Sequence, residues 1–89
     1  MIDERMMAAP KVSVYSTKTC PYCIMAKQYL SDKGIKYTDY DVGADSKRAQ
    51  EMVVKSNQRG VPVLEINGHI IIGFDRNAID TALADNLRW

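Results

Sequence analysis

The chain has 89 residues, and its 12 lysines and arginines against 11 acidic residues give a net charge of +1 at neutral pH. This near-balance argues against nucleic acid or an anionic membrane surface as the main partner. With 46% hydrophobic and 26% charged residues, and no apolar run long enough to span a membrane, the composition indicates one small soluble domain.

Residues 1–10 show no clear periodicity and end in Ala8-Ala9-Pro10, so we predict a flexible extension ahead of a domain at residues 11–89. Charged residues among the first five stand where a secretory signal needs an apolar core. We therefore expect a cytoplasmic protein. In that reducing compartment a cysteine pair is more often catalytic or metal-binding than structural.

The first predicted strand and helix lie on either side of the only two cysteines. Residues 11–16 alternate apolar and polar, as a half-buried strand does. Residues 21 to about 33 follow as a helix that ends before Gly34. The residues on the apolar face of this helix are Cys23, Ala26 and Leu30.

A second strand is predicted at residues 35–42, and its charged side chains suit the edge of a sheet better than its centre. Asp45 or Ser46 can cap a second helix that runs to about Ser56. A loop at residues 57–60 follows. The residues of this helix expected to face the core are Ala49, Met52 and Val53.

Residues 61–66 are mostly apolar and predict a central third strand. The turn Asn67-Gly68 then predicts a hairpin with a fourth strand at residues 69–72, because both turn positions need a positive φ. Asp75 can cap a final helix. The residues on the apolar face of that helix are Ile79, Ala82, Leu83 and Leu87.

These elements follow the order β-α-β-α-β-β-α and predict an α/β domain with a four-stranded mixed sheet and helices on both faces. Right-handed crossovers place the first strand parallel to both the second and the third, and the hairpin adds an antiparallel fourth strand. The cysteine pair is expected at the exposed rim of the sheet, where the first strand ends and the first helix begins.

The two cysteines are predicted to differ in reactivity. Thr19 is a candidate N-cap and Pro21 suits the first helical turn. The helix dipole and free N–H groups favour a thiolate there, so Cys20, with Lys18 nearby, is expected to be the exposed, low-pKa attacking thiol. Cys23, one turn further in, is placed to resolve a mixed disulfide formed at Cys20.

Two structural roles compete with this redox role. The pair could be half of a zinc site, but a closed site needs four ligands and only His69 could add one. It could also be a static disulfide, but a three-residue spacing closes a very small loop and adds little stability. The redox role is therefore favoured, and no metal is expected.

At this point the chain resembles a known family. Three motifs occur in order along the chain: Cys20-Pro21-Tyr22-Cys23 between a strand and a helix, Val61-Pro62 at the start of a strand, and Gly73 after a hairpin. This combination is similar to the glutaredoxin branch of the thioredoxin fold. The resemblance covers about residues 11–87, nearly the whole chain.

The resemblance implies roles for the matching residues. Cys20 would be the nucleophile, Cys23 the resolving thiol, and Tyr22 would flank the reactive sulfur. Pro62 would follow a cis peptide bond and face the disulfide. The backbone of Val61 would pair with a bound thiol peptide as an added strand.

Three positions depart from the glutathione-dependent members of the family. Thr17 stands where they usually carry a basic residue, and Gly60 where they usually carry threonine. Gly73 is followed by Phe74 and Asp75, where they carry a second glycine and polar residues that hold the glycine carboxylate of glutathione. A Gly-Phe turn is similar to glutaredoxin-like donors to ribonucleotide reductase that thioredoxin reductase recharges.

We expect a monomeric dithiol–disulfide oxidoreductase that reduces protein disulfides and glutathione mixed disulfides, with no bound cofactor and glutathione as its reductant. Lys18 and Arg59 could hold a substrate carboxylate, and the last helix offers N–H groups from Asp75 onward. One alternative is an electron donor recharged by thioredoxin reductase. Another is an iron–sulfur cluster carrier that uses Cys20 and glutathione.

Overall fold

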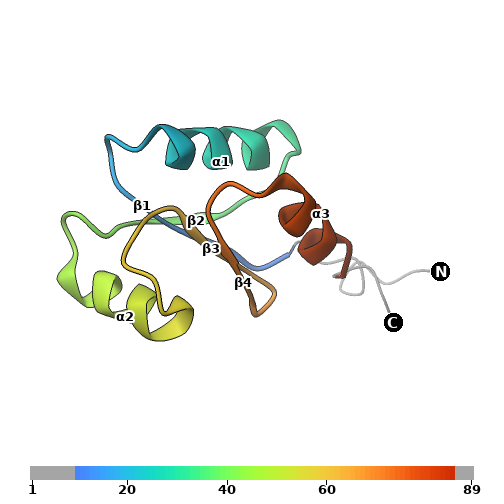
Figure 1. Ribbon diagram of the computed structural model, residues 1–89. Coiled ribbons are helices and arrows are strands. Elements are labelled where there is room, and N and C mark those ends of the chain that lie inside the picture. The colour runs from blue at the N-terminus through green and yellow to red at the C-terminus, as the bar shows by residue number, and fades with distance from the viewer. Residues whose placement is uncertain (1–9, 86–89) are drawn as a thin grey trace.

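The computed structural model describes residues 10–85, so Leu87 and residues 1–9 of the extension predicted at residues 1–10 lie outside the described part. Figure 1 shows the elements in the predicted order, β-α-β-α-β-β-α. They are β1 (Val12–Ser16), α1 (Pro21–Asp32), β2 (Thr38–Asp41), α2 (Ser46–Ser56), β3 (Val63–Ile66), β4 (His69–Ile72) and α3 (Arg76–Asp85). Residues 35–37 and 61–62, predicted as parts of strands, lie in the connections instead. Within residues 10–85, no helix combines the length and the apolar character that crossing a bilayer needs.

The four strands form one sheet in the order β2-β1-β3-β4, so β2 lies at an edge and β3 is internal, as predicted. β1 is parallel to β2, and β3 is antiparallel to β4. The predicted parallel pairing of β1 with β3 is wrong, because these two strands are antiparallel.

The path through α2 explains the reversed direction of β3. The end of β1 pairs with the end of β2 at Ser16 and Asp41, and it pairs with the start of β3 at Tyr15 and Val63. The 11 residues of α2 span only about 16 Å and return the chain to the end of the sheet that β2 left. The right-handed crossover rule applies only to a connection that leads to a parallel strand, and this one does not.

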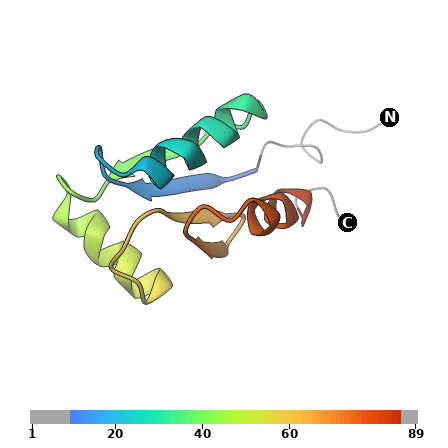
Figure 2. The ribbon, with the colours of Figure 1, turned by 45° about the horizontal axis from the view of Figure 1, so that its top comes forward.

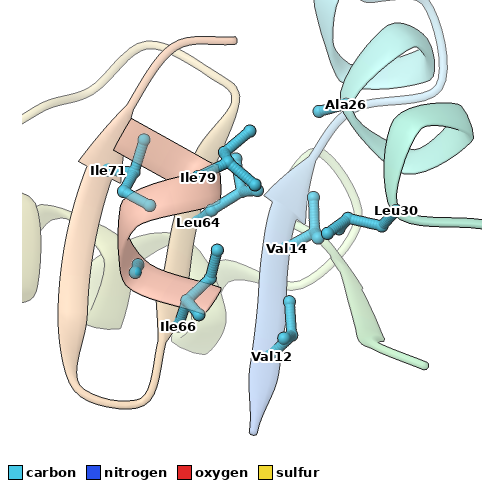
Figure 3. Packing of buried hydrophobic residues seen from close by; sticks show 9 residues of the cluster. Val12, Val14, Ala26, Leu30, Leu64, Ile66, Ile71 and Ile79 are labelled. Carbon is cyan, nitrogen blue, oxygen red and sulfur yellow. The ribbon is translucent and has the colours of Figure 1, made fainter. Parts of the chain in front are cut away.

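The helices cover both faces of the sheet. α1 and α3 pack on one face and α2 on the other, as Figures 1 and 2 show. In Figure 3, Ala26 and Leu30 of α1 point toward Val14 of β1, and Ile79 of α3 lies near Leu64 of β3. The smaller core beneath α2 consists of Tyr15, Met52 and Val63.

Local signals place one turn and the starts of two helices where the sequence predicts. Asn67 and Gly68 adopt φ values of 51° and 88°, which makes the hairpin turn between β3 and β4. Asp75 caps α3 by accepting a hydrogen bond from the N–H of Ala78 at 3.1 Å. Asp45, rather than Ser46, is the N-cap of α2 and accepts from the N–H groups of Lys47 and Arg48, both at 3.1 Å.

Asp45→Ala should lower the free energy of unfolding by about 1 kcal/mol, because two N–H groups of α2 lose their acceptor. Urea unfolding followed by circular dichroism measures this loss. Ser46→Ala is the matched control and should change stability by only a few tenths of a kcal/mol, since Ser46 lies just inside the helix. Equal losses in both variants would contradict the assignment of the cap.

Candidate active site

Cys20 occupies the junction between β1 and α1 and is itself the N-cap of the helix. Its backbone is extended, with φ −89° and ψ 115°, and its Sγ accepts a hydrogen bond from the N–H of Cys23 at 3.3 Å. The prediction of Thr19 as the cap is therefore wrong. Pro21 takes the first helical position. Its ring holds the preceding residue, Cys20, in an extended conformation, so Cys20 becomes the cap.

The two free thiols differ in burial and in acidity. Cys23 is completely buried, whereas Cys20 is half-buried. Burial, reinforced by the hydrogen bond with Cys20, raises the pKa of Cys23 to about 11. Burial also raises the pKa of Cys20, but the contacts with the Cys23 side chain, two backbone N–H groups and a lysine charge outweigh it, so the net pKa is lowered.

The segment before β3 lies next to the Sγ atom of Cys20. The Val61–Pro62 peptide bond is cis, which confirms the sequence prediction. The Cys20 thiol donates to the carbonyl oxygen of Val61 at 3.8 Å. The buried Pro62 accepts at its own carbonyl from the N–H of Gly73, at 2.8 Å, so the turn after β4 joins the same site.

This arrangement agrees with the comparisons to known proteins. The glutaredoxin family profile matches residues 12–71, from β1 into β4 and including both cysteines. The chain belongs to the glutaredoxin family. It is a glutaredoxin-like thiol oxidoreductase.

Individual relatives support the assignment to the glutaredoxins. An uncharacterized glutaredoxin-like 8.6 kDa protein in the rubredoxin operon of Clostridium pasteurianum is 46% identical over 69 residues, which cover 78% of this chain and 92% of the relative. Glutaredoxin 3 of Escherichia coli K12 is 34% identical over 64 residues, or 72% and 77% of the two chains. The crystal structure of a glutaredoxin from Archaeoglobus fulgidus superposes with a TM-score of 0.76 over 92% of this chain and 95% of its own. At 16% identity that likeness concerns the fold, and it confirms the thioredoxin-like architecture.

Phe74 and Asp75 of this glutaredoxin both have structural partners. The Phe74 ring packs edge-on against Tyr29 of α1, with ring centroids 5.7 Å apart, and is partly buried against the main core. The Asp75 carboxylate turns back to cap α3. Tyr22, by contrast, is 61% exposed next to the cysteines.

The cation that lowers the pKa of Cys20 is Lys27 and not the predicted Lys18. Lys18 is exposed on the loop before Cys20, and Arg59 is exposed on the loop before Val61. Lys27 lies four residues after Cys23 on α1, and this one-turn spacing is the signal in the sequence that could have identified it.

The structure separates His69 from the glutaredoxin thiols. His69 pairs with Ile66, and Ile66 pairs with Val12 at the start of β1, so the histidine lies at the end of the sheet opposite the cysteines. Over residues 10–85 no group of three or more His, Cys, Asp or Glu side chains could hold a metal ion. The zinc site that needs His69 together with both cysteines therefore has no geometric basis.

Proposed function

We propose that this glutaredoxin is a dithiol oxidoreductase that reduces protein disulfides and glutathione mixed disulfides. The observation that carries the proposal is the contrast between the two thiols. Cys20 is accessible with a lowered pKa, and Cys23, three residues away, is buried with a raised one. A pair of this kind assigns attack to one thiol and resolution to the other.

In the first step the Cys20 thiolate attacks one sulfur of the substrate disulfide. A mixed disulfide forms on Cys20, and the other substrate sulfur leaves as a thiolate. In the second step Cys23 loses its proton and attacks the Cys20 sulfur, which releases the second substrate thiol. The two electrons come from the cysteine pair, which ends as the Cys20–Cys23 disulfide.

The first step also prepares the site for the substrate backbone. While Cys20 is protonated, its S–H donates to the carbonyl of Val61. A mixed disulfide on Cys20 has no S–H, so that carbonyl becomes available to an N–H of the bound peptide. Backbone pairing of this kind adds the substrate as a short strand beside Val61.

Glutathione is the proposed reductant, with weak but measurable turnover. Val61 offers the backbone pairing, and Lys18 and Arg59 supply exposed positive charge for its carboxylates. The N-terminus of α3, however, already holds the Asp75 carboxylate, which repels an incoming anion. This occupied helix end favours a second candidate, an electron donor that thioredoxin reductase recharges.

A coupled NADPH assay with two branches tests both candidates. One branch contains glutathione and its reductase, and the other contains thioredoxin reductase, with the same disulfide substrate in each. Turnover in the glutathione branch supports the proposal, and turnover only in the thioredoxin reductase branch supports the second candidate. If neither branch oxidises NADPH above the blank, both candidates fail.

Asp75→Asn should lower the KM for glutathione by about two- to fivefold, because asparagine keeps the helix cap but removes the repelling charge. Initial rates in the glutathione branch measure this change. Asp80→Asn is the control, because it also removes a negative charge from α3. The Asp80 carboxylate is already paired with Tyr29 and Lys33. Equal changes in KM for the two variants would show that the charge at the start of α3 does not limit glutathione binding.

A further inference from the structure

Three side chains from three different elements form a closed hydrogen-bonded group one helical turn from Cys23. The Lys27 ammonium donates to Asp39 Oδ2 at 2.9 Å and to Ser16 Oγ at 3.4 Å. Ser16 in turn donates to Asp39 Oδ1 at 2.6 Å. Lys27 belongs to α1, Ser16 to β1 and Asp39 to β2, so the group joins the helix that carries Cys23 to two strands.

This group holds the lysine in one place. A surface lysine normally leaves its ammonium free in water, but only 22% of the Lys27 side chain is exposed and Ser16 is buried. The hydrogen bond to Asp39 raises the pKa of Lys27, so the lysine remains protonated throughout the neutral range. Lys27 therefore supplies a fixed positive charge and does not act as a proton acceptor.

Building on the proposed function, we propose that Lys27, held by Ser16 and Asp39, stabilises the Cys23 thiolate that attacks the mixed disulfide on Cys20. Cys23 is completely buried and cannot be stabilised by bulk water. Lys27 lies four residues further along α1 and so on the same side of the helix as Cys23. The hydrogen bonds of the Lys27 ammonium go to Asp39 and Ser16, so Lys27 acts on the sulfur through its charge and is a positioning residue for the resolving step.

The intermediate itself makes this charge effective. In the reduced protein, burial makes the largest contribution to the raised pKa of Cys23, and the hydrogen bond and the charge of Cys20 raise it further. A hydrogen bond from the Thr17 backbone and the charge of Lys27 lower it. Once Cys20 is part of a mixed disulfide it carries neither a charge nor a proton to share. The contributions of Thr17 and Lys27 remain, so the pKa of Cys23 is expected to fall when its thiolate is needed.

The electron and proton balance of the step is complete without another reactant. The Cys23 S–H proton passes to water, the new bond joins Cys23 to Cys20, and the bond from Cys20 to the substrate sulfur breaks. That substrate sulfur leaves as a thiolate and takes up a proton from water. The titratable groups that act on Lys27 are Asp39, Tyr37 and Cys23, and those that act on Cys23 are Cys20 and Lys27.

A stopped-flow reaction with the chromogenic disulfide dithiobis(nitrobenzoate) separates the two steps. Attack by Cys20 releases one coloured thiolate at a rate proportional to reagent concentration, and attack by Cys23 releases the second at a rate independent of it. Lys27→Met should slow the second phase at pH 7 by about three- to tenfold and move its pH midpoint up by about half to one unit. Lys27→Arg keeps the charge and should restore most of the rate.

Lys33→Met is the matched control, because Lys33 also lies on the α1 side of the molecule but pairs with Asp80, 3.6 Å away. It should leave both phases unchanged, and thermal unfolding of all variants checks that each is folded. An unshifted second phase in Lys27→Met, or equal slowing in Lys27→Arg, overturns the inference. Absence of the first phase in the wild type would instead refute the proposed function.

Discussion

Cys20→Ser is expected to reduce turnover on every disulfide substrate by about a thousandfold or more, to the level of the blank reaction. The serine hydroxyl cannot ionise near neutral pH, and the buried Cys23, with a pKa raised to about 11, cannot replace the lost nucleophile. Both branches of the coupled assay measure this loss. Serine is also a good helix cap, so the fold of the variant should be preserved.

Cys23→Ser separates the two roles and is the natural control. A glutathione mixed disulfide needs only the attack by Cys20, because a second glutathione can release the first from Cys20. This variant should keep much of its activity on that substrate. It should lose the reduction of protein disulfides that depend on the resolving step, so equal losses on both substrates would refute the division between the thiols.

Much of the fold could be predicted from the sequence because local interactions determine it. The hairpin at Asn67-Gly68 depends on two residues that tolerate a positive φ. The caps at Asp45 and Asp75 depend on carboxylates that lie within three residues of the N–H groups they accept from. The cysteine pair at the junction of β1 and α1 follows from the change of periodicity around it.

Apart from the cap of α1, which was predicted at Thr19 and lies at Cys20, the failures concern interactions between residues that are distant in the sequence. The direction of β3 depends on where α2 returns the chain, and no pattern within residues 57–62 reports that. The ring of Phe74 finds Tyr29 on another helix, so its structural partner could not be predicted from the turn in which it lies.

The electrostatics of the site show the same limit. Lys18 is near Cys20 in sequence, but the cation that acts on both thiols is Lys27. Asp39 on the edge strand β2 and Ser16 at the end of β1 hold it there. A charged residue on an edge strand normally indicates only that its side chain is exposed. The contacts of Asp39 and Ser16 with Lys27 could therefore be recognised only in the tertiary structure.

Alkylation of the reduced protein should modify Cys20 at least about a hundred times faster than Cys23 at pH 7. The pKa of Cys20 is lowered below that of a free cysteine, about 8.5, and the pKa of Cys23 is raised to about 11, so their thiolate fractions differ by more than two powers of ten. As the pH rises, the Cys20 rate should level off first, while the rate at which Cys23 is labelled in molecules whose Cys20 is still unmodified keeps increasing toward about pH 11. Burial of Cys23 adds to the difference, because the reagent must also reach the sulfur.

Timed quenching followed by tandem mass spectrometry measures both rates in one sample. Residues 19–27 form a single tryptic peptide that contains both cysteines, so fragment ions on either side of Tyr22 locate the label. The same measurement in a denaturant is the control, and there the two rates should approach each other because the helix N-terminus and the burial are lost. If Cys23 were labelled first in the folded protein at low pH, the assignment of Cys20 as the attacking thiol would be wrong.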